Sequence, residues 1–263
     1  MAAFENFLLM HEGALRGSAF FGLLIVLFIL EQALPRRRQQ VSAAHYGGNL
    51  LLGGLNIVLL RLIAPAGLVG IALWQTGGGL LGALSLPLWA EFALCLVLLD
   101  LTLYAQHRLF HKIDFLWRWH APHHADRDLN VASGVRFHPG EALISFAVKA
   151  AAIAILGAPI AAVILFEVLL SGASLFNHAN WNLGRGDTVL RKIIVTPDMH
   201  RLHHSRDARE ALRNFGFFLS IWDRLFASYK NTPDTPHESL PLGLEDISSD
   251  TIGTALSQPF QRD

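Results

Sequence analysis

The stretch ALISFAVKAAAIAILGAPIAAVILFEVLLSGASLF, residues 142–176, decides how this chain folds. Only two of its residues, Lys149 and Glu167, are charged. It is too long for one crossing of a bilayer core, which takes about 20 helical residues. Gly157 and Pro159 interrupt it near its middle, and both residue types break helices. We therefore predict a hairpin bent at these residues, with both of its ends on the same side of the membrane.

Each arm of this hairpin has about 15 to 17 residues, which is roughly 22 to 26 Å of helix. This is slightly short of a hydrocarbon core about 30 Å thick, so the hairpin either re-enters without crossing or thins the bilayer locally. Charges at membrane depth are costly and mark functional positions by default. Lys149 and Glu167 lie on opposite arms, so either they pair or Lys149 extends its ammonium group to the interface.

The composition also indicates a membrane protein. Of 263 residues, 52% are hydrophobic and 16% are charged, with a mean hydropathy of +0.38, whereas soluble domains have about 25% charged residues. The formal net charge is +0, which gives no electrostatic reason to expect nucleic-acid binding. The only cysteine, Cys95, excludes an intrachain disulfide and any metal site built from several cysteines.

Three further apolar stretches precede the hairpin, at residues 17–34, about 50–74, and 87–105. The first could be mistaken for a signal peptide, but Glu5 and Glu12 precede it and no small-residue cleavage pattern follows it. We predict that it is a retained span. Residues 1–105 are therefore expected to form N-terminal transmembrane helices.

Charge asymmetry gives the orientation of these spans. The loop after the first span carries Arg36, Arg37 and Arg38, whereas the loop at 75–86 carries no charge. The positive-inside rule places the arginine loop in the cytoplasm. The third span then returns to the cytoplasmic side, and the hairpin brings the chain back to that same side.

Histidines gather where the spans end on this side. They occur as HRLFH (107–111), HAPHH (120–124), NHAN (177–180) and HRLHH (200–204). On a helix, residues three and four apart share a face, so each cluster presents its imidazoles together. Proline is tolerated in the first helical turn, where we place Pro122, and Thr196-Pro197-Asp198 is typical of a helix start.

The number of imidazoles exceeds what one metal can use. A structural zinc takes four ligands and a catalytic zinc takes three and a water, so two metals with four or five nitrogens each fit better. Any single histidine is more simply a polar group at the interface, but this many in two HxxHH clusters and an HxxxH pair predict a metal centre. Imidazole suits zinc, copper, iron and nickel. The HExxH pattern of zinc proteases is absent, and a redox metal pair at a membrane surface suits O2 chemistry on lipid.

The segments HRLFH, WRWHAPHH, RFHPGE, FNHAN, VTPDMHRLHHS and NFGFFLSIWDRLF occur in this order. Over about residues 90–230 the chain resembles the fatty acid hydroxylase/sterol desaturase superfamily, especially its bacterial members. The resemblance implies a membrane di-iron enzyme that uses O2 and electrons from a separate protein, of the ferredoxin or cytochrome b5 type, to hydroxylate or desaturate a lipid, sterol or similar apolar substrate. The implied iron ligands are His107, His111, His120, His123, His124, His178, His200, His203 and His204.

One departure from that family concerns the third cluster. Several relatives have a further histidine there, whereas this chain has Asn182 four residues after His178. In related acyl desaturases an asparagine holds one metal through a water, and the resemblance extends that role to Asn182. His138, in RFHPGE, is a candidate tenth ligand or supporting residue. We expect His11, His45 and His237 to be ordinary surface residues.

Supporting carboxylates are expected beside the histidines, because metal-bound histidine usually donates its other N–H to a carboxylate or a carbonyl. Asp100 shares one helical face with His107 and is the first candidate, and the simpler alternative is an acid at a helix end near the interface. Asp198 and Asp223 are weaker candidates. The basic residues of the region contact either anionic headgroups or a redox partner, or form a solvated face; they are Arg191, Lys192, Arg206, Arg209 and Arg213.

The sequence thus predicts an all-α fold of polytopic membrane helices with a cytoplasmic histidine-rich helical cap. Residues 106–230 form the catalytic region, which includes the hairpin, and residues 231–263 form an extended or mobile tail. Two alternatives remain open at this point. One is a metal transporter or sensor without catalysis, and the other is a zinc-dependent lipid hydrolase.

Overall fold

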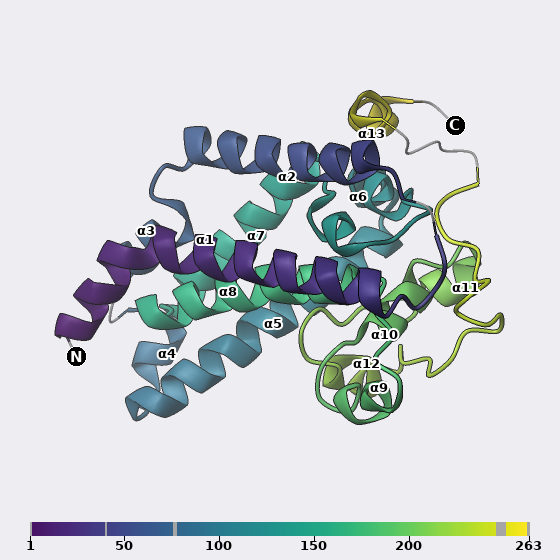
Figure 1. Cartoon of the computed structure of the whole chain (residues 1–263). Coiled ribbons are helices and arrows are strands. Elements are labelled where there is room, and N and C mark those ends of the chain that lie inside the picture. The colour runs from purple at the N-terminus through teal and green to yellow at the C-terminus, as the bar shows by residue number, and fades with distance from the viewer. Residues whose placement is uncertain (1, 40, 76–77, 246–250, 262–263) are drawn as a thin grey trace.

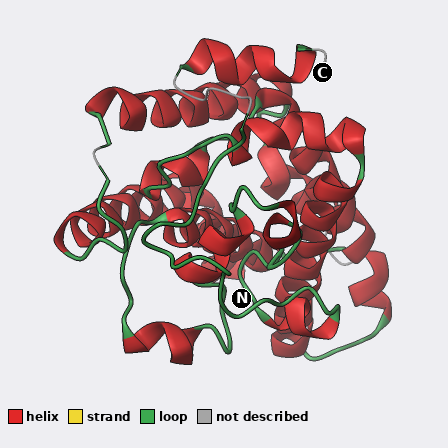
Figure 2. Ribbon diagram, turned by 90° about the vertical axis from the view of Figure 1, so that its right-hand side faces the viewer, coloured by secondary structure: helices red, strands yellow, loops and turns green. Residues whose placement is uncertain are grey.

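The computed structural model describes residues 2–39, 41–75, 78–245 and 251–261. Within these ranges the chain is helical, without strands, and has three isolated β-bridges in its connecting segments. Figure 2, which faces the end of the molecule that carries the short helices, shows loops and short helices in front of the long ones. The prediction of an all-α fold is confirmed.

Long apolar helices form the body of the molecule (Figure 1). They are α1 (Ala2–Ala33), α2 (Ala43–Ile63), α5 (Leu88–Lys112), α7 (Pro139–Leu156) and α8 (Ile160–His178). By length and composition the described residues contain five segments able to cross a membrane: Glu5–Ala33, Ala43–Ala83, Leu88–Lys112, Pro139–Leu156 and Ile160–His178. Large apolar side chains on the outer faces of α1 and α2 are more than half exposed, such as Phe21, Ile25 and Ile57, which suits contact with lipid.

The long apolar stretch is broken where the sequence predicts the bend. Helix α7 ends at Leu156 and α8 begins at Ile160, with Gly157 as the C-cap in a left-handed conformation at φ 66°. A Cβ atom on Gly157 would lie 1.8 Å from the carbonyl oxygen of Gly78, so only glycine fits this bend. The arms have 18 and 19 residues, or about 27 to 28 Å of helix, which is longer than predicted and close to the thickness of a hydrocarbon core.

Helix α8 lies at the centre of the bundle. In its most apolar window 56% of the residues are buried, against 6% to 28% in the other four candidate spans. Helices α1 and α5 and the 3-10 helix η1 (Val131–Val135) pack against it. One charge on α8, Glu167, pairs with Arg16 of α1 at 2.9 Å. Among the described residues, this ion pair therefore joins the hairpin to α1, and Glu167 makes no ion pair with Lys149 on the other arm.

The second apolar stretch is not one continuous helix. Helix α2 ends at Ile63, and α3 (Gly67–Gln75) begins after a break that contains Pro65. Gly67 has a positive φ of 57°, which residues with a side chain rarely adopt. Helix α4 (Gly79–Ala83) follows and packs against α7 near the hairpin bend.

A second set of short helices gathers at the opposite end from this bend (Figure 1). They are α6 (Asp114–His124), α9 (Arg185–Leu190), α10 (Pro197–His203), α11 (Ala208–Ala211) and α12 (Ile221–Leu225). The C-terminal segment is not simply extended, because it forms α13 (Ile252–Ser257) and the 3-10 helix η2 (Gln258–Phe260). Helix η2 packs on α6, where Phe260 and Trp119 meet edge to face.

Candidate metal centre

Four elements deliver histidines to one place. Helix α5 carries two at its C-terminal end, α6 carries three, α8 ends at His178, and α10 with its C-cap carries three. Because α5 and α8 end on the same side of the bundle, the hairpin makes this meeting possible. The ligand atoms of each of two groups lie within 4.8 Å of one another. The first group is His107, His111, His120, His124 and His203, and the second is His123, His178, His200 and His204.

The local sequence of α10 explains how its histidines are presented. Thr196 is the N-cap, and its side chain accepts a hydrogen bond from the Met199 amide, while Pro197 follows in the first turn. This part of the sequence prediction is confirmed. The placement of Pro122 in a first turn is wrong, because α6 begins at Asp114 and Pro122 lies near its C-terminal end. There the missing N–H of proline removes only a bond of the last turns.

Most of these histidines are oriented by a hydrogen bond from Nδ1. Backbone carbonyls accept it from four of them, at 2.7 to 3.1 Å. Since a carbonyl only accepts, Nδ1 must carry the hydrogen and Nε2 must carry the lone pair. This is the tautomer that binds a metal through Nε2. The pairs are His107 with Phe215, His123 with Arg136, His178 with Ser174, and His203 with Arg213.

Facing lone pairs show that these groups fit cations. The Nε2 atoms of His107 and His203 lie 3.0 Å apart, and those of His123 and His178 lie 3.1 Å apart. Two such lone pairs repel unless a positive ion is shared between them. A metal–nitrogen bond of about 2.1 Å places neighbouring ligands of one ion about 3.0 to 3.4 Å apart, as observed here. Three further Nε2 atoms are buried without a hydrogen-bond partner among the described residues: those of His111, His120 and His124.

Burial keeps the imidazoles of the two histidine groups neutral. Loss of hydration disfavours the charged form, and the neighbouring imidazoles add to this effect. The pKa therefore falls well below the usual 6.5 for His120, His123, His124, His200, His203 and His204. Neutral imidazole is the form that binds metal, so the two histidine groups are ready to bind metal at neutral pH.

Glu141 is a candidate supporting residue that sequence reasoning missed. Its Oε1 accepts a hydrogen bond from His120 Nδ1 at 2.7 Å, and both side chains are buried. It lies in the first turn of α7, three residues after His138 in the HPGE motif. A carboxylate at the start of an apolar helix is costly to bury unless it has a partner. That cost was the available signal, because a buried acid at this position needs a partner nearby. His120 meets this need at one of the two carboxylate oxygens.

Asp100 does not touch a histidine. It accepts hydrogen bonds from the indole N–H of Trp222 at 2.7 Å and from the amides of Phe218 and Leu219. Asp223 accepts from the amides of Phe215 and Gly216, both at 2.8 Å. The two carboxylates therefore hold the segment whose Phe215 carbonyl orients His107. Their link to His107 thus runs through the backbone of this segment.

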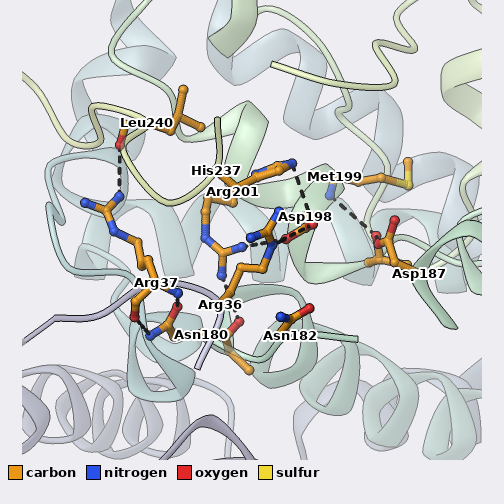
Figure 3. Close-up of polar contacts among 12 residues, drawn as sticks. Arg36, Arg37, Asn180, Asn182, Asp187, Asp198, Met199, Arg201, His237 and Leu240 are labelled. Atoms are coloured by element: carbon orange, nitrogen blue, oxygen red, sulfur yellow. Dashed lines mark hydrogen bonds and ion pairs between the residues drawn. The ribbon is translucent and has the colours of Figure 1, made fainter. Parts of the chain in front are cut away.

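The other three supporting candidates also lie outside the two histidine groups. His138 caps α7, because its Nδ1 accepts from the Gly140 amide, and its Nε2 donates to the Leu256 carbonyl. Asn182 is exposed, and its side-chain oxygen accepts from the Gly184 amide. Asp198 binds Arg36 and Arg201 instead of a histidine ligand (Figure 3). A water-mediated role of Asn182 at the metal thus has no support in this arrangement.

Two histidines expected at the surface are partly or largely buried. The side chain of His45 is 16% exposed and pairs with the fully buried Asp126 at 3.2 Å. His237 lies 3.6 Å from Asp198 (Figure 3), and burial lowers its pKa to about 4. His11 is exposed as expected.

Comparisons with known proteins agree with this site. The sequence model described as "Fatty acid hydroxylase" matches residues 92–228, which include both histidine groups and Glu141. Ornithine lipid hydroxylase OlsE of Rhizobium tropici is 33% identical over 176 residues, covering 67% of this chain and 52% of that protein. Alkylglycerol monooxygenase of Homo sapiens is 28% identical over 131 residues, covering 50% and 28%. The chain thus spans about half or less of these relatives. No solved structure matches it significantly.

Proposed function

The chain belongs to the fatty acid hydroxylase family, and we propose that it is a membrane hydroxylase that inserts one atom of O2 into a C–H bond of a lipid. The reaction consumes the lipid, O2, two electrons and two protons, and it yields the hydroxylated lipid and water. Two iron ions at the histidine groups would supply the reduction of O2, which amino-acid side chains alone do not provide. The observation that carries the proposal is the pair of buried histidine groups with converging Nε2 atoms.

The protein's own part is to hold the two metal sites fixed and dry. The carbonyls of Phe215 and Arg213 lock His107 and His203 in the metal-binding tautomer, and Glu141 does the same for His120. Burial of the histidines keeps bulk water away from the place where reactive oxygen species would form. The five-histidine group and the four-histidine group would each hold one ion.

The substrate that we propose is a membrane lipid with a polar headgroup. Helices able to cross a membrane end at the proposed metal centre, which supports approach of an acyl chain from the bilayer. The two relatives are named for ornithine lipid and alkylglycerol. One is named a hydroxylase and the other a monooxygenase, which favours hydroxylation over desaturation.

We further propose that the metal centre faces the cytoplasm and takes electrons from a separate protein of the ferredoxin or cytochrome b5 type. The arginine-rich loop at residues 36–38 lies at the same end of the molecule as the histidines, which supports a cytoplasmic position by the positive-inside rule. The exposed Arg209 and Arg213 offer a basic surface to an acidic donor. The Arg213 carbonyl accepts a hydrogen bond from His203, so this surface is in direct contact with a proposed metal ligand.

The arrangement disfavours both alternatives. A transporter needs ligands along its spans, whereas these histidines gather at the ends of α5 and α8 and in the short helices α6 and α10. A catalytic zinc keeps three protein ligands and an open position, whereas the two groups here offer five and four.

The test uses the full-length protein in lipid nanodiscs, loaded with iron and supplied with a reducing system, lipid extract and oxygen-18 gas. We expect a hydroxylated lipid that carries the heavy oxygen. His120→Ala should abolish this product while the protein still inserts into the membrane. The matched control, His11→Ala, changes an exposed histidine outside both groups and should keep the product. Product formed without O2, or carrying oxygen from water, would contradict a hydroxylase.

A further inference from the structure

A polar pocket lies beside the metal centre. Its volume is about 510 Å³, within the range of roughly 300 to 1,000 Å³ that is usual for small-molecule sites. It lies where α1 ends and α2 begins, and its wall includes Asn180, two residues beyond His178. Nothing in the proposed metal chemistry uses this pocket.

The negative charge in the wall is already satisfied by the protein. Glu31 is 2% exposed, and its carboxylate accepts hydrogen bonds from the amides of Val131 and Asn180 at 2.9 and 3.0 Å. The hydroxyl of Tyr46 donates to the same carboxylate at 2.8 Å. With these three donors, Glu31 ties α1 to η1 and to the segment after α8. It has little capacity left to bind a cation in the pocket.

The positive charges in the wall have no acidic partner among the described residues. Arg37 and Arg38 both line the pocket. Arg38 is exposed and makes no hydrogen bond or ion pair within the described ranges. The Nε atom of Arg37 is buried and also lacks a hydrogen-bond partner in that part of the chain. An unpaired guanidinium donor is matched by a phosphate or a carboxylate, which accept from its planar fork of N–H groups.

The arginine loop is held in place before any ligand binds. The Asn180 side chain accepts from the Arg37 amide at 3.1 Å and donates to the Arg37 carbonyl at 2.8 Å. The Arg37 guanidinium donates to the carbonyl of Leu240 at 2.9 Å (Figure 3). The Arg36 amide adds a bond to the Asn180 carbonyl at 2.8 Å. Such preorganisation reduces the entropy lost when a ligand binds.

We propose that this pocket binds the phosphate or carboxylate group of a membrane lipid headgroup through Arg37 and Arg38. Its place at the end of a membrane helix is the level at which headgroups lie. The same headgroup, held next to the end of α8, restricts the substrates of the metal centre to lipids with an anionic or zwitterionic headgroup. This second step rests on the proposed function, whereas binding itself does not.

The first experiment measures binding without turnover. The full-length protein in neutral detergent is titrated with short-chain phosphatidic acid, with diacylglycerol of the same chains, and with inorganic phosphate. We expect phosphatidic acid to bind at least 10-fold more tightly than either other probe. Inorganic phosphate binding as tightly as phosphatidic acid would overturn the headgroup in favour of a free anion. Diacylglycerol binding equally well would overturn an anion site altogether.

Variants then assign the binding to this pocket. Arg38→Gln removes a charge that has no hydrogen bond or ion pair among the described residues, so it should preserve folding and weaken phosphatidic acid binding about 3- to 10-fold. The double variant Arg37→Gln/Arg38→Gln should weaken it further. The matched control is Arg61→Gln, an exposed arginine at the other end of α2, and it should bind as the wild type does. Unchanged binding by the double variant would overturn the proposal.

Turnover separates this proposal from the proposed function. On an anionic lipid, Arg38→Gln should raise KM by a similar factor and leave kcat within about twofold, because the charge lies outside the metal centre. Headgroup binding without any hydroxylation would refute the proposed function and leave the binding site standing. Hydroxylation with an unchanged KM in Arg38→Gln would refute the headgroup's role in selecting the substrate.

Discussion

Glu141 provides a sharp test of how the protein holds its metal ligands, because it is the carboxylate bonded to His120. Replacing it by alanine leaves the buried Nδ1–H of His120 without its acceptor at 2.7 Å. A hydrogen bond to a charged group is worth about 1.5 to 3 kcal/mol. Each 1.4 kcal/mol is about tenfold in an equilibrium constant, so the loss corresponds to roughly 10- to 150-fold. Losses of about 10- to 100-fold are typical for residues that orient metal ligands.

Glu141→Gln is the matched variant, because its amide oxygen can accept the same hydrogen bond without the charge. We therefore expect Glu141→Ala to weaken iron binding by the full factor and Glu141→Gln to retain most of it. The assay titrates iron into the purified metal-free protein and compares the dissociation constants, with the hydroxylation rate measured in parallel. Equal iron affinity in wild type and Glu141→Ala would refute the orienting role. Equal losses in both variants would show that charge, and not orientation, is what matters.

Three other changes test the fold and the electrostatics. Asp100→Ala leaves the buried Trp222 indole and two partly buried amides without their acceptor and should cost about 3 kcal/mol of stability. Its effect on iron affinity should be smaller than that of Glu141→Ala; the melting temperature in detergent and an iron titration check this. Gly157→Ala forces a left-handed residue against the Gly78 carbonyl and should cost at least about 1 to 3 kcal/mol, whereas Gly54→Ala, with nothing within 4 Å of the added carbon, should not destabilise. The pKa values of six buried histidines of the two groups lie below 6.5 in the folded chain. Below pH 6.5 these histidines bind fewer protons in the folded than in the unfolded chain, so the metal-free protein should lose stability as the pH falls from about 6.5 towards 4. A melting temperature independent of pH in this range would contradict their burial as neutral groups.

The features that could be predicted from sequence are those set by local pattern. Gly157 and Pro159 mark the hairpin because each limits the backbone in a way that ends a helix. Histidines three and four residues apart share a face wherever a helix forms, so HRLFH and HRLHH could be interpreted without knowing their neighbours. Together with the positions of the apolar stretches, these patterns were enough to expect α5 and α8 to end side by side.

The features that could not be predicted depend on contacts between distant segments. His107 and His203 are oriented by backbone carbonyls, and every residue has a carbonyl, so no sequence pattern identifies the partner. Asp100 was expected to touch a histidine because it shares a helical face with His107, but its acceptor oxygens face the segment at 218–222 instead. The pairing of Glu167 with Arg16 likewise depends on how α1 packs on α8.

The central claim is that each chain holds two metal ions, one at each histidine group. The most direct measurement is the metal content of the full-length protein, purified after expression with ample iron, by elemental mass spectrometry against an amino-acid-analysis concentration. The account predicts about two iron atoms per chain, and in His200→Ala, which changes only the four-histidine group, loss of one of them. Fewer than two metal ions in the wild type, or zinc in place of iron, would contradict it.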